Sequence, residues 1–295
     1  MLYNKIMICD ICPRLCKIDR AKSAGFCGMA EKIKIAKADV FMWEEPIISG
    51  TKGSGAIFFS GCNLKCCFCQ NYKISNEGFG KEISVERLAE IFCELEQKGV
   101  HNINLVSPSH YVPQIESALK IYNPKIPIVW NSNGYESVET LERVAKFADI
   151  FLMDMKFYDE NLSQKYCKAK NYFDVASKAI KTVLEKSPNM KIENGILQKG
   201  VVIRHLVMPN CANDSIKILE WLKNNTNCNF VLSIMGQYVP YFNSCIFPEI
   251  NRTIKPLEYK IVINKALELG FDNAYTQELE SGNVIFVPDW DLKGV

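Results

Sequence analysis

Short apolar runs alternate with amphipathic stretches over most of this chain. The apolar runs, each as long as a strand buried on both faces, cover residues 56–60, 102–106, 126–130, 150–155, 201–207 and 230–235. Apolar residues recur at helical spacing within residues 84–99, 111–122, 137–148, 159–167, 174–186, 214–222 and 256–270. Strands that alternate with helices predict an α/β fold with a parallel sheet and right-handed crossovers. Eight strands would favour a closed barrel, whereas six favour an open one.

Local signals divide the chain into three parts. Residues 31–49 begin with alternating apolar positions and predict a lead-in strand that Pro46 ends. The Glu44-Glu45 pair before this proline is an acid–base candidate, although a solvated turn is the favoured interpretation. We expect a cysteine-rich segment and lead-in strand in residues 1–50 and a core barrel in 51–250. A last helix and a tail with an apolar run at 284–287 complete the chain in 251–295.

Composition and charge narrow the functional class. The 295 residues suffice for one large core with an appendage, and 48% hydrophobic and 23% charged residues are ordinary for a globular protein. A net charge of +2 argues for neither a nucleic-acid nor an anionic-membrane partner. No signal peptide or transmembrane run is visible, so we expect a cytoplasmic protein. Thiols stay reduced there, and the clustered cysteines among the 13 favour metal over disulfides.

Three cysteines lie on the loop after the strand at 56–60. Cys62, Cys66 and Cys69 are spaced C-x3-C-x2-C. Three thiolates can hold three irons of a 4Fe–4S cluster, whose usual ligand is cysteine. A closed structural site takes four protein ligands, so three leave one iron open to a substrate or cofactor. A zinc loop or buried free thiols are the alternative. Cys67 gives a poorer spacing, and we expect it to pack beside the cluster.

Four further cysteines gather near the N-terminus. Cys9, Cys12, Cys16 and Cys27 are spaced C-x2-C-x3-C-x10-C. Four thiolates in so short a window can close a tetrahedral zinc site or hold a second iron–sulfur cluster. A small segment without its own core would take its folding energy from such a metal.

Charged side chains lie in or just after two central apolar strands. Asp154 and Lys156 are at the end of the run at 150–155, and Arg204 lies inside the run at 201–207. Such groups are costly to bury unless they are paired or bound. Arg204 has five N–H donors, for which a bidentate carboxylate is the best partner. A ligand carboxylate and a structural ion pair remain as alternatives.

Two other polar residues follow strand ends. His110, after the run at 102–106, is a candidate proton donor, but a polar cap on the next helix is the favoured interpretation. Tyr238, after the run at 230–235, is either the rim of a ligand site or part of the core.

The cysteine loop, with Phe68 before its last cysteine, resembles the signature of the radical S-adenosylmethionine (SAM) superfamily. The six-strand count fits the partial (β/α)6 barrel of that family. The resemblance implies that an open iron of a 4Fe–4S cluster binds the amino and carboxylate groups of SAM. It also implies that one electron, from a donor such as flavodoxin or ferredoxin, releases a 5′-deoxyadenosyl radical.

Within the superfamily, the chain resembles homologues of the pyruvate formate-lyase activating enzyme. It shares the N-terminal C-x2-C-P-R-x-C, the W-E-E-P at 43–46, the F-C-Q-N at 68–71 and the V-P-D at 287–289. Asn131-Ser132-Asn133-Gly134 and Asp154-Met155-Lys156 are similar to the Asp-Thr-Asn-Gly and Asp-Leu-Lys of the activases. Ser107-Pro108-Ser109-His110 stands where much of the superfamily has Gly-Gly-Glu-Pro to hold the SAM amino group, and Ser107, Ser109 and the backbone are the alternatives for that role. The resemblance implies SAM contacts by Asn71, Ser107, Asn131, Asp154, Lys156 and Arg204.

We therefore expect a radical SAM enzyme with a small N-terminal metal-binding segment. Activation of a partner protein by formation of a glycyl radical competes with modification of a peptide or a small metabolite. A non-catalytic iron–sulfur or zinc-binding protein is the alternative from another class. The expected substrate is a protein or peptide glycine.

Overall fold

The computed structural model describes residues 8–277 and 288–295. Over these ranges the strands form one sheet in the order β10-β9-β8-β6-β5-β4-β2-β1-β3, with β7 paired to β8. The strands are β1 Ile33–Phe41, β2 Ser54–Phe59, β3 Lys81–Ile83, β4 Ile103–Val106, β5 Ile128–Ser132, β6 Ile150–Asp154, β7 Lys191–Glu193, β8 Ile196–Leu206, β9 Val231–Met235 and β10 Ala274–Thr276.

The parallel part of the sheet confirms the predicted α/β class. Each of the six apolar runs forms a strand, and β2, β4, β5, β6, β8 and β9 pair in parallel. The strand β10 adds to β9 in parallel and escaped prediction, because it is short and half exposed. The lead-in strand is β1, which pairs antiparallel with β2. The order runs from β10 to β3 without closing, so the sheet is open.

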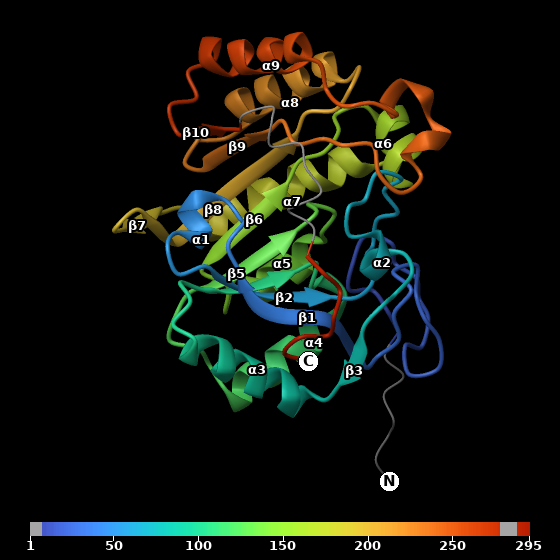
Figure 1. Ribbon diagram of the computed structural model, residues 1–295, viewed down its shortest axis with the longest axis vertical. Coiled ribbons are helices and arrows are strands. Elements are labelled where there is room, and N and C mark those ends of the chain that lie inside the picture. Colours follow the sequence, from blue (N-terminus) through green and yellow to red (C-terminus); the bar gives the residue numbers. More distant parts are fainter. Residues whose placement is uncertain (1–7, 278–287) are drawn as a thin grey trace.

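Most of the helices cover the outer face of this curved sheet (Figure 1). They are α1 Pro46–Ser49, α2 Tyr72–Ser75, α3 Val85–Gln97, α4 Val112–Ile121, α5 Val138–Val144, α6 Glu160–Cys167, α7 Tyr172–Lys186, α8 Ala212–Asn225 and α9 Pro256–Glu268. The main core lies between sheet and helices, with Phe92 of α3, Ile180 of α7 and Leu222 of α8 fully buried. Ser84 caps α3, because its hydroxyl accepts from the Arg87 amide, whereas the hydroxyl of Ser137 before α5 donates to the Ile11 carbonyl.

The short helix α1 fills the inner face of the sheet. Its Ile47 and Ile48 pack against Val129 of β5, Leu152 of β6 and Val202 of β8. Pro46 therefore does more than end a strand, because it occupies the first turn of this helix, where its missing N–H costs nothing. Glu44 and Glu45, which lead into α1, are drawn into the interior with it. The solvated turn predicted for them is wrong: their side chains are 9% and 7% exposed.

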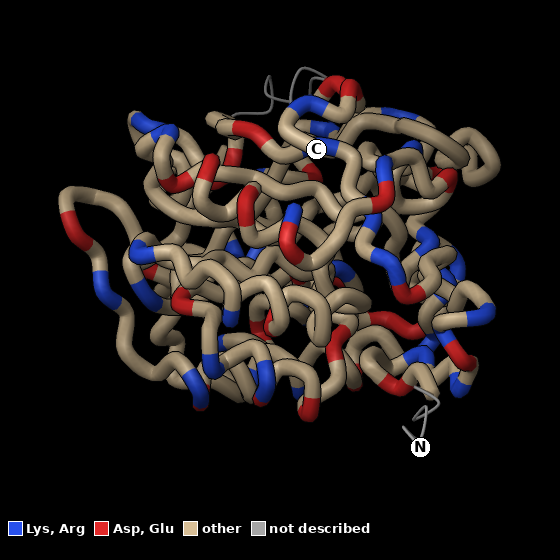
Figure 2. Tube along the Cα trace, turned by 90° about the horizontal axis from the view of Figure 1, so that it is seen from below, with Lys and Arg blue, Asp and Glu red and all other residues tan. Residues whose placement is uncertain are grey.

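Charge is spread over the surface. Figure 2 shows Lys and Arg interspersed with Asp and Glu along the whole trace. In the described part of the chain, no helix has both the length and the apolar character needed to cross a membrane. The apolar run predicted at 284–287 lies outside the described residues.

Candidate functional site

The cysteine loop leaves β2 and closes over the carboxyl ends of the parallel strands. Cys62, Cys66 and Cys69 line one pocket. The end of α6 holds this loop from one side, because the amides of Lys65 and Cys67 donate to the carbonyls of Cys167 and Tyr166 at 3.1 and 2.8 Å. Cys67 is buried in an adjoining apolar cluster. Its position fits the packing role predicted for it.

The three thiols are suited to an iron–sulfur cluster. Burial raises the pKa of Cys62 and raises that of Cys69 to about 12. Such thiols stay protonated unless a metal deprotonates them on binding. The Leu64 amide and the Asn133 side-chain amide approach the Cys62 sulfur at 3.4 and 3.3 Å, the kind of N–H···S contact that tunes cluster sulfurs.

The ligand type of the pocket cysteines is compatible with an iron–sulfur cluster. Over residues 8–277 and 288–295, no three His, Cys, Asp or Glu side chains are arranged to hold a single metal ion, and this holds for both groups of cysteines. A 4Fe–4S cluster takes each thiolate on a different iron.

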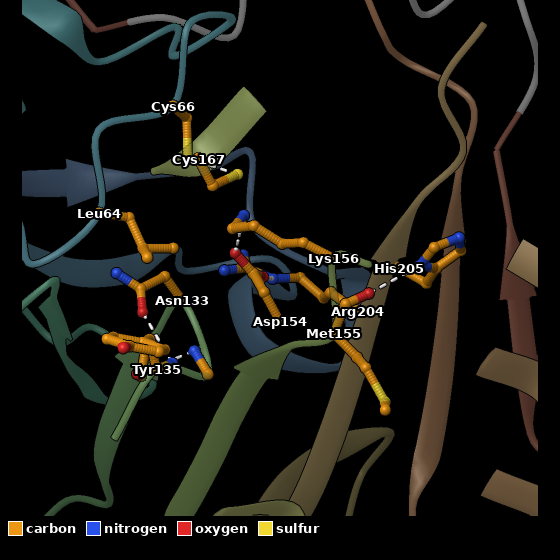
Figure 3. Close-up of polar contacts among 12 residues, drawn as sticks. Leu64, Cys66, Asn133, Tyr135, Asp154, Met155, Lys156, Cys167, Arg204 and His205 are labelled. Carbon is orange, nitrogen blue, oxygen red and sulfur yellow. Dashed lines mark hydrogen bonds and ion pairs between the residues drawn. The ribbon is translucent and has the colours of Figure 1, made fainter. Parts of the chain in front are cut away.

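A fourth cysteine, which sequence reasoning missed, touches this set. The Cys167 sulfur lies 3.2 Å from the Cys66 sulfur (Figure 3). Cys167 is the last residue of α6 and is fully buried. It has no metal-ligand spacing to any other cysteine, so no local motif marks it.

Polar side chains from four strands meet beside the cysteines. Asp154 of β6 and Arg204 of β8 are direct partners in the parallel register, so their side chains share one face of the sheet. The Arg204 Nε lies 2.8 Å from the Asp154 Oδ1, and the Lys156 Nζ lies 2.7 Å from the Asp154 Oδ2. Figure 3 shows Lys156 and Arg204 converging on this carboxylate. Asp154 thus joins two cations that the sequence placed separately.

Arg204 has further partners within the network. Its Nη2 donates to the Asn131 Oδ1 at 2.7 Å, and its Nη1 donates to the Glu44 Oε2 at 3.1 Å. The other Glu44 oxygen accepts from the side-chain amides of Asn131 and Asn104 at 3.1 and 3.2 Å. The structure therefore provides the structural ion pairs that were the alternative for Arg204. Three of its five N–H groups are used in these contacts.

Burial and neighbouring charge set opposite pKa shifts in this network. Burial alone would raise the pKa of Asp154, but Arg204 and Lys156 hold it below its usual value. Burial raises the pKa of Glu44 to about 7; the adjacent Glu45 also raises it, and Arg204 opposes both. Asp154 is thus the stably ionised member, while Glu44 holds its charge only weakly.

The remaining predicted residues lie around or near the pocket. Asn71 and Ser107 both line it, and Ser107 has the left-handed φ of 55°. His110 is neither a cap nor an exposed proton donor: its Nε2 lies 2.7 Å from the Ser60 carbonyl, and burial lowers its pKa to about 3. Tyr238 is buried with its hydroxyl donating to the Ile250 carbonyl at 2.8 Å, and it lines an adjoining pocket that shares Cys66 and Arg204 with the first.

The N-terminal cysteines lie directly beside the cysteine loop. The Cys62 amide donates to the Cys27 carbonyl at 3.2 Å, and the Arg14 Nε donates to the Asn63 carbonyl at 2.8 Å. Burial raises the pKa of Cys12 to about 12, and the Cys27 and Cys9 thiols add to this rise, so these groups are within electrostatic reach. A shared metal at Cys9, Cys12, Cys16 and Cys27 stays a prediction.

Comparison with known proteins identifies the family. The sequence profile of the Radical SAM superfamily matches residues 56–222, more than half of the chain. The chain belongs to the radical SAM superfamily. Membership implies an enzyme that uses a 4Fe–4S cluster and SAM. The uncharacterized protein MJ0674 of Methanocaldococcus jannaschii is 33% identical over 275 residues, which cover 88% of this chain and 73% of that protein.

Two solved structures share the fold of this radical SAM enzyme. SuiB of Streptococcus suis, bound to the precursor peptide SuiA, superposes with a TM-score of 0.51 at 13% identity, over 74% of this chain and 46% of SuiB. A radical SAM methyltransferase from Sphaerobacter thermophilus gives 0.51 at 10% identity, over 75% of this chain and 65% of that protein. The chain thus spans about half the length of SuiB. At such low identity, these likenesses describe the fold alone.

Proposed function

We propose that Cys62, Cys66 and Cys69 hold the catalytic 4Fe–4S cluster and that SAM binds in the pocket that they share with the Arg204 network. The observation that carries this proposal is the convergence of both sets of residues on one pocket. The bound cluster supplies the electron that cleaves SAM to a 5′-deoxyadenosyl radical. An external carrier such as flavodoxin or ferredoxin is the proposed source of that electron.

The chain's own residues orient SAM in this proposal. Lys156 and the two remaining N–H groups of Arg204 are donors for the SAM carboxylate or ribose. Asn71, Ser107 and Asn131 add neutral polar groups along the same wall. Asp154 keeps both cations in place through its two oxygens. Because these groups are already paired within the protein, little side-chain freedom is lost when the ligand binds.

For the substrate, we propose a glycine of a partner protein or peptide. The support is the similarity of residues 131–134, 154–156 and the Arg204 strand to the activases. The sheet does not close over the described residues, and the pocket lined by the cysteines and Glu44 has a volume of about 230 Å³ and is partly open to solvent. An extended loop can enter such a mouth, whereas a small metabolite is usually enclosed by its site.

A second candidate is the modification of another residue in a peptide. It is supported by the fold shared with SuiB, a protein that has been captured with a precursor peptide. Both candidates place the target beside the same cysteine pocket, and they differ in whether a radical persists on the partner.

Anaerobic incubation of the reconstituted protein with SAM and dithionite tests the chemistry. We expect 5′-deoxyadenosine to form, and its absence from protein that holds iron would contradict the proposal. Adding candidate glycyl-radical proteins from the same cell tests the substrate, because a stable glycyl signal by electron paramagnetic resonance is expected. SAM consumption in proportion to a peptide, with no such signal, would favour the second candidate.

A further inference from the structure

The acidic groups around the pocket outnumber the cations that face them. Glu44, Glu45 and Asp154 supply three carboxylates, whereas Arg204 and Lys156 supply two positive charges. Arg204 is the shared partner, with its Nη1 at 3.1 Å from the Glu44 Oε2 and 3.9 Å from the Glu45 Oε2. When all three carboxylates are ionised, one buried negative charge has no full counter-charge from these five side chains, and either a proton on Glu44 or a cationic ligand must compensate it.

Two buried acceptor atoms next to Glu44 also lack a hydrogen-bond donor. In the described part of the chain, the Glu45 Oε2 and the Asn104 Oδ1 have no hydrogen-bond partner. Only 7% of the Glu45 side chain is exposed, and Asn104 is completely buried. Buried polar atoms normally have partners. Both atoms are acceptors, so the missing partner is a donor or a cation rather than an anion.

Glu44 faces the pocket, with Glu45 behind it. Glu44 lines the same space as Cys62, Cys66 and Cys69. Ser107 lies at the position of the Gly-Gly-Glu that much of the superfamily has for the SAM amino group, and it adds no charge there. The carboxylates instead come from the segment before α1, which the packing of Ile47 and Ile48 carries into the sheet interior.

We infer that Glu44, with the negative charge of Glu45 behind it, is a cation-selecting subsite that holds SAM through its positive charge. This inference rests on the proposed function. Free SAM carries positive charge on the sulfonium and on the ammonium group; an amino group that binds iron has lost its proton, so on the cluster it offers N–H donors and the sulfonium keeps the charge. S-Adenosylhomocysteine keeps the amino group but has a neutral thioether, and 5′-methylthioadenosine has neither charge. The subsite therefore favours SAM over adenosyl compounds that lack its charge.

Calorimetric binding to the anaerobically reconstituted holoenzyme tests the subsite. We expect Glu44→Gln to weaken SAM binding about tenfold or more, as expected when one partner of a buried charge contact is neutralised, and to leave 5′-methylthioadenosine unchanged. If S-adenosylhomocysteine weakens as much as SAM, Glu44 recognises the N–H groups of the amino group; if it does not, Glu44 recognises the charge of the sulfonium. Equal changes for all three ligands, or none for SAM, would overturn the inference.

Matched variants separate charge recognition from folding. Glu45→Gln should weaken SAM binding in the same direction by a smaller factor, and it replaces an oxygen that accepts no hydrogen bond. Glu136→Gln is the control: this carboxylate is also buried with an unpartnered oxygen, but it bonds to Ser109 and Ser132 and is absent from the lining of the cysteine pocket. It should leave all three affinities unchanged.

The thermal midpoint of each variant checks that the variant folds. If Glu44→Gln does not fold, the SAM affinity of Glu45→Gln tests the subsite. Unchanged SAM affinity in that variant would then count against the subsite. If the wild-type protein forms 5′-deoxyadenosine but the Glu44 and Glu45 variants bind SAM normally, the subsite is refuted and the proposed function stands. Wild-type protein that binds no SAM would refute the proposed function itself.

Discussion

The sulfurs of Cys66 and Cys167 lie 3.2 Å apart, so Cys167 is close enough to the cysteine loop to be considered as a fourth ligand. Cys167 comes from α6, and its carbonyl accepts the Lys65 amide, so this helix end positions the loop through backbone as well as sulfur. If Cys167 were a fourth ligand, the cluster would have no open iron for SAM. We therefore assign Cys167 to support of the loop and not to the ligand set.

Alanine variants of the cysteines test this assignment. Cys66→Ala is expected to lose bound iron and SAM cleavage, because only two of the three loop ligands remain. Cys167→Ala and Cys67→Ala should both retain iron, and they serve as controls because they make the same cysteine-to-alanine change. Iron content and 5′-deoxyadenosine yield are the measurements. Full iron and activity in Cys66→Ala would show that the ligand set is wrong.

The buried Glu44 carboxyl makes the free energy of unfolding depend on pH. Burial raises its pKa from 4.5 to about 7, with Glu45, Asp154 and Arg204 around it. Between these two values the folded chain binds more protons at this site than the unfolded chain. The free energy of unfolding therefore decreases as pH rises through this window, by at most about 1.4 kcal/mol per pH unit.

Denaturant unfolding of the apoprotein at several pH values measures this effect. Glu44→Gln should flatten the decrease between about pH 5 and pH 7. Glu139→Gln, an exposed change on α5, should leave the slope as it is. An unaltered slope in Glu44→Gln would mean that this carboxyl titrates normally.

At the scale of elements, the turn between β5 and α5 holds two strand ends together. Gly134 has a φ of +81°, and a Cβ there would lie 2.1 Å from the Asp154 carbonyl oxygen. Only glycine accommodates both this left-handed conformation and this close approach. The turn thereby keeps the end of β5, with Asn131, against the end of β6, with Asp154.

Gly134→Ala is expected to destabilise the protein and to weaken SAM binding, because the ends of β5 and β6 must separate. Gly99→Ala is the matched control, since its φ is +76° but no atom lies within 4 Å of the added Cβ. That control should cost only the backbone penalty, about 1–2 kcal/mol. Chemical denaturation and SAM affinity compare the two variants, and equal losses would argue against a role of the turn in the site.

At the scale of the whole molecule, the N-terminal segment depends on contacts with the barrel. Ile8, Leu15 and Phe26 remain 53%, 53% and 39% exposed, so the segment buries little apolar surface of its own. Arg20 donates to the carbonyls of His110 and Ala30, and Arg14 donates to that of Asn63. A metal at its four cysteines would supply the missing folding energy.

Metal analysis of a Cys62/Cys66/Cys69 triple alanine variant tests this second site. We expect zinc or iron to remain bound, because Cys9, Cys12, Cys16 and Cys27 are untouched. Adding Cys9→Ala and Cys12→Ala to the triple variant should remove that metal and loosen the segment, seen as faster proteolysis near the N-terminus. A triple variant that folds well without any metal would refute the prediction.

Much of the fold was predictable from the chain alone. Strands buried on both faces need continuous apolar runs, and helices packed on one face need apolar residues at helical spacing, so each element left a local pattern. The cysteine loop left a local signal for a similar reason, because Cys62, Cys66 and Cys69 belong to one short segment, and its binding of a cluster stays a prediction. Of the strands in the described parallel sheet, β10 left too short a pattern to detect.

The sequence by itself therefore determined the class of fold and the positions of the cysteine loop and of the polar residues at the strand ends. Only the tertiary structure decided how those polar residues pair. The contact of Arg204 with Asp154 depends on strand register, that of Cys66 with Cys167 on the packing of α6, and the burial of Glu44 on the insertion of α1. Local periodicity records whether a segment is buried, but contacts between distant segments follow from how the elements pack together.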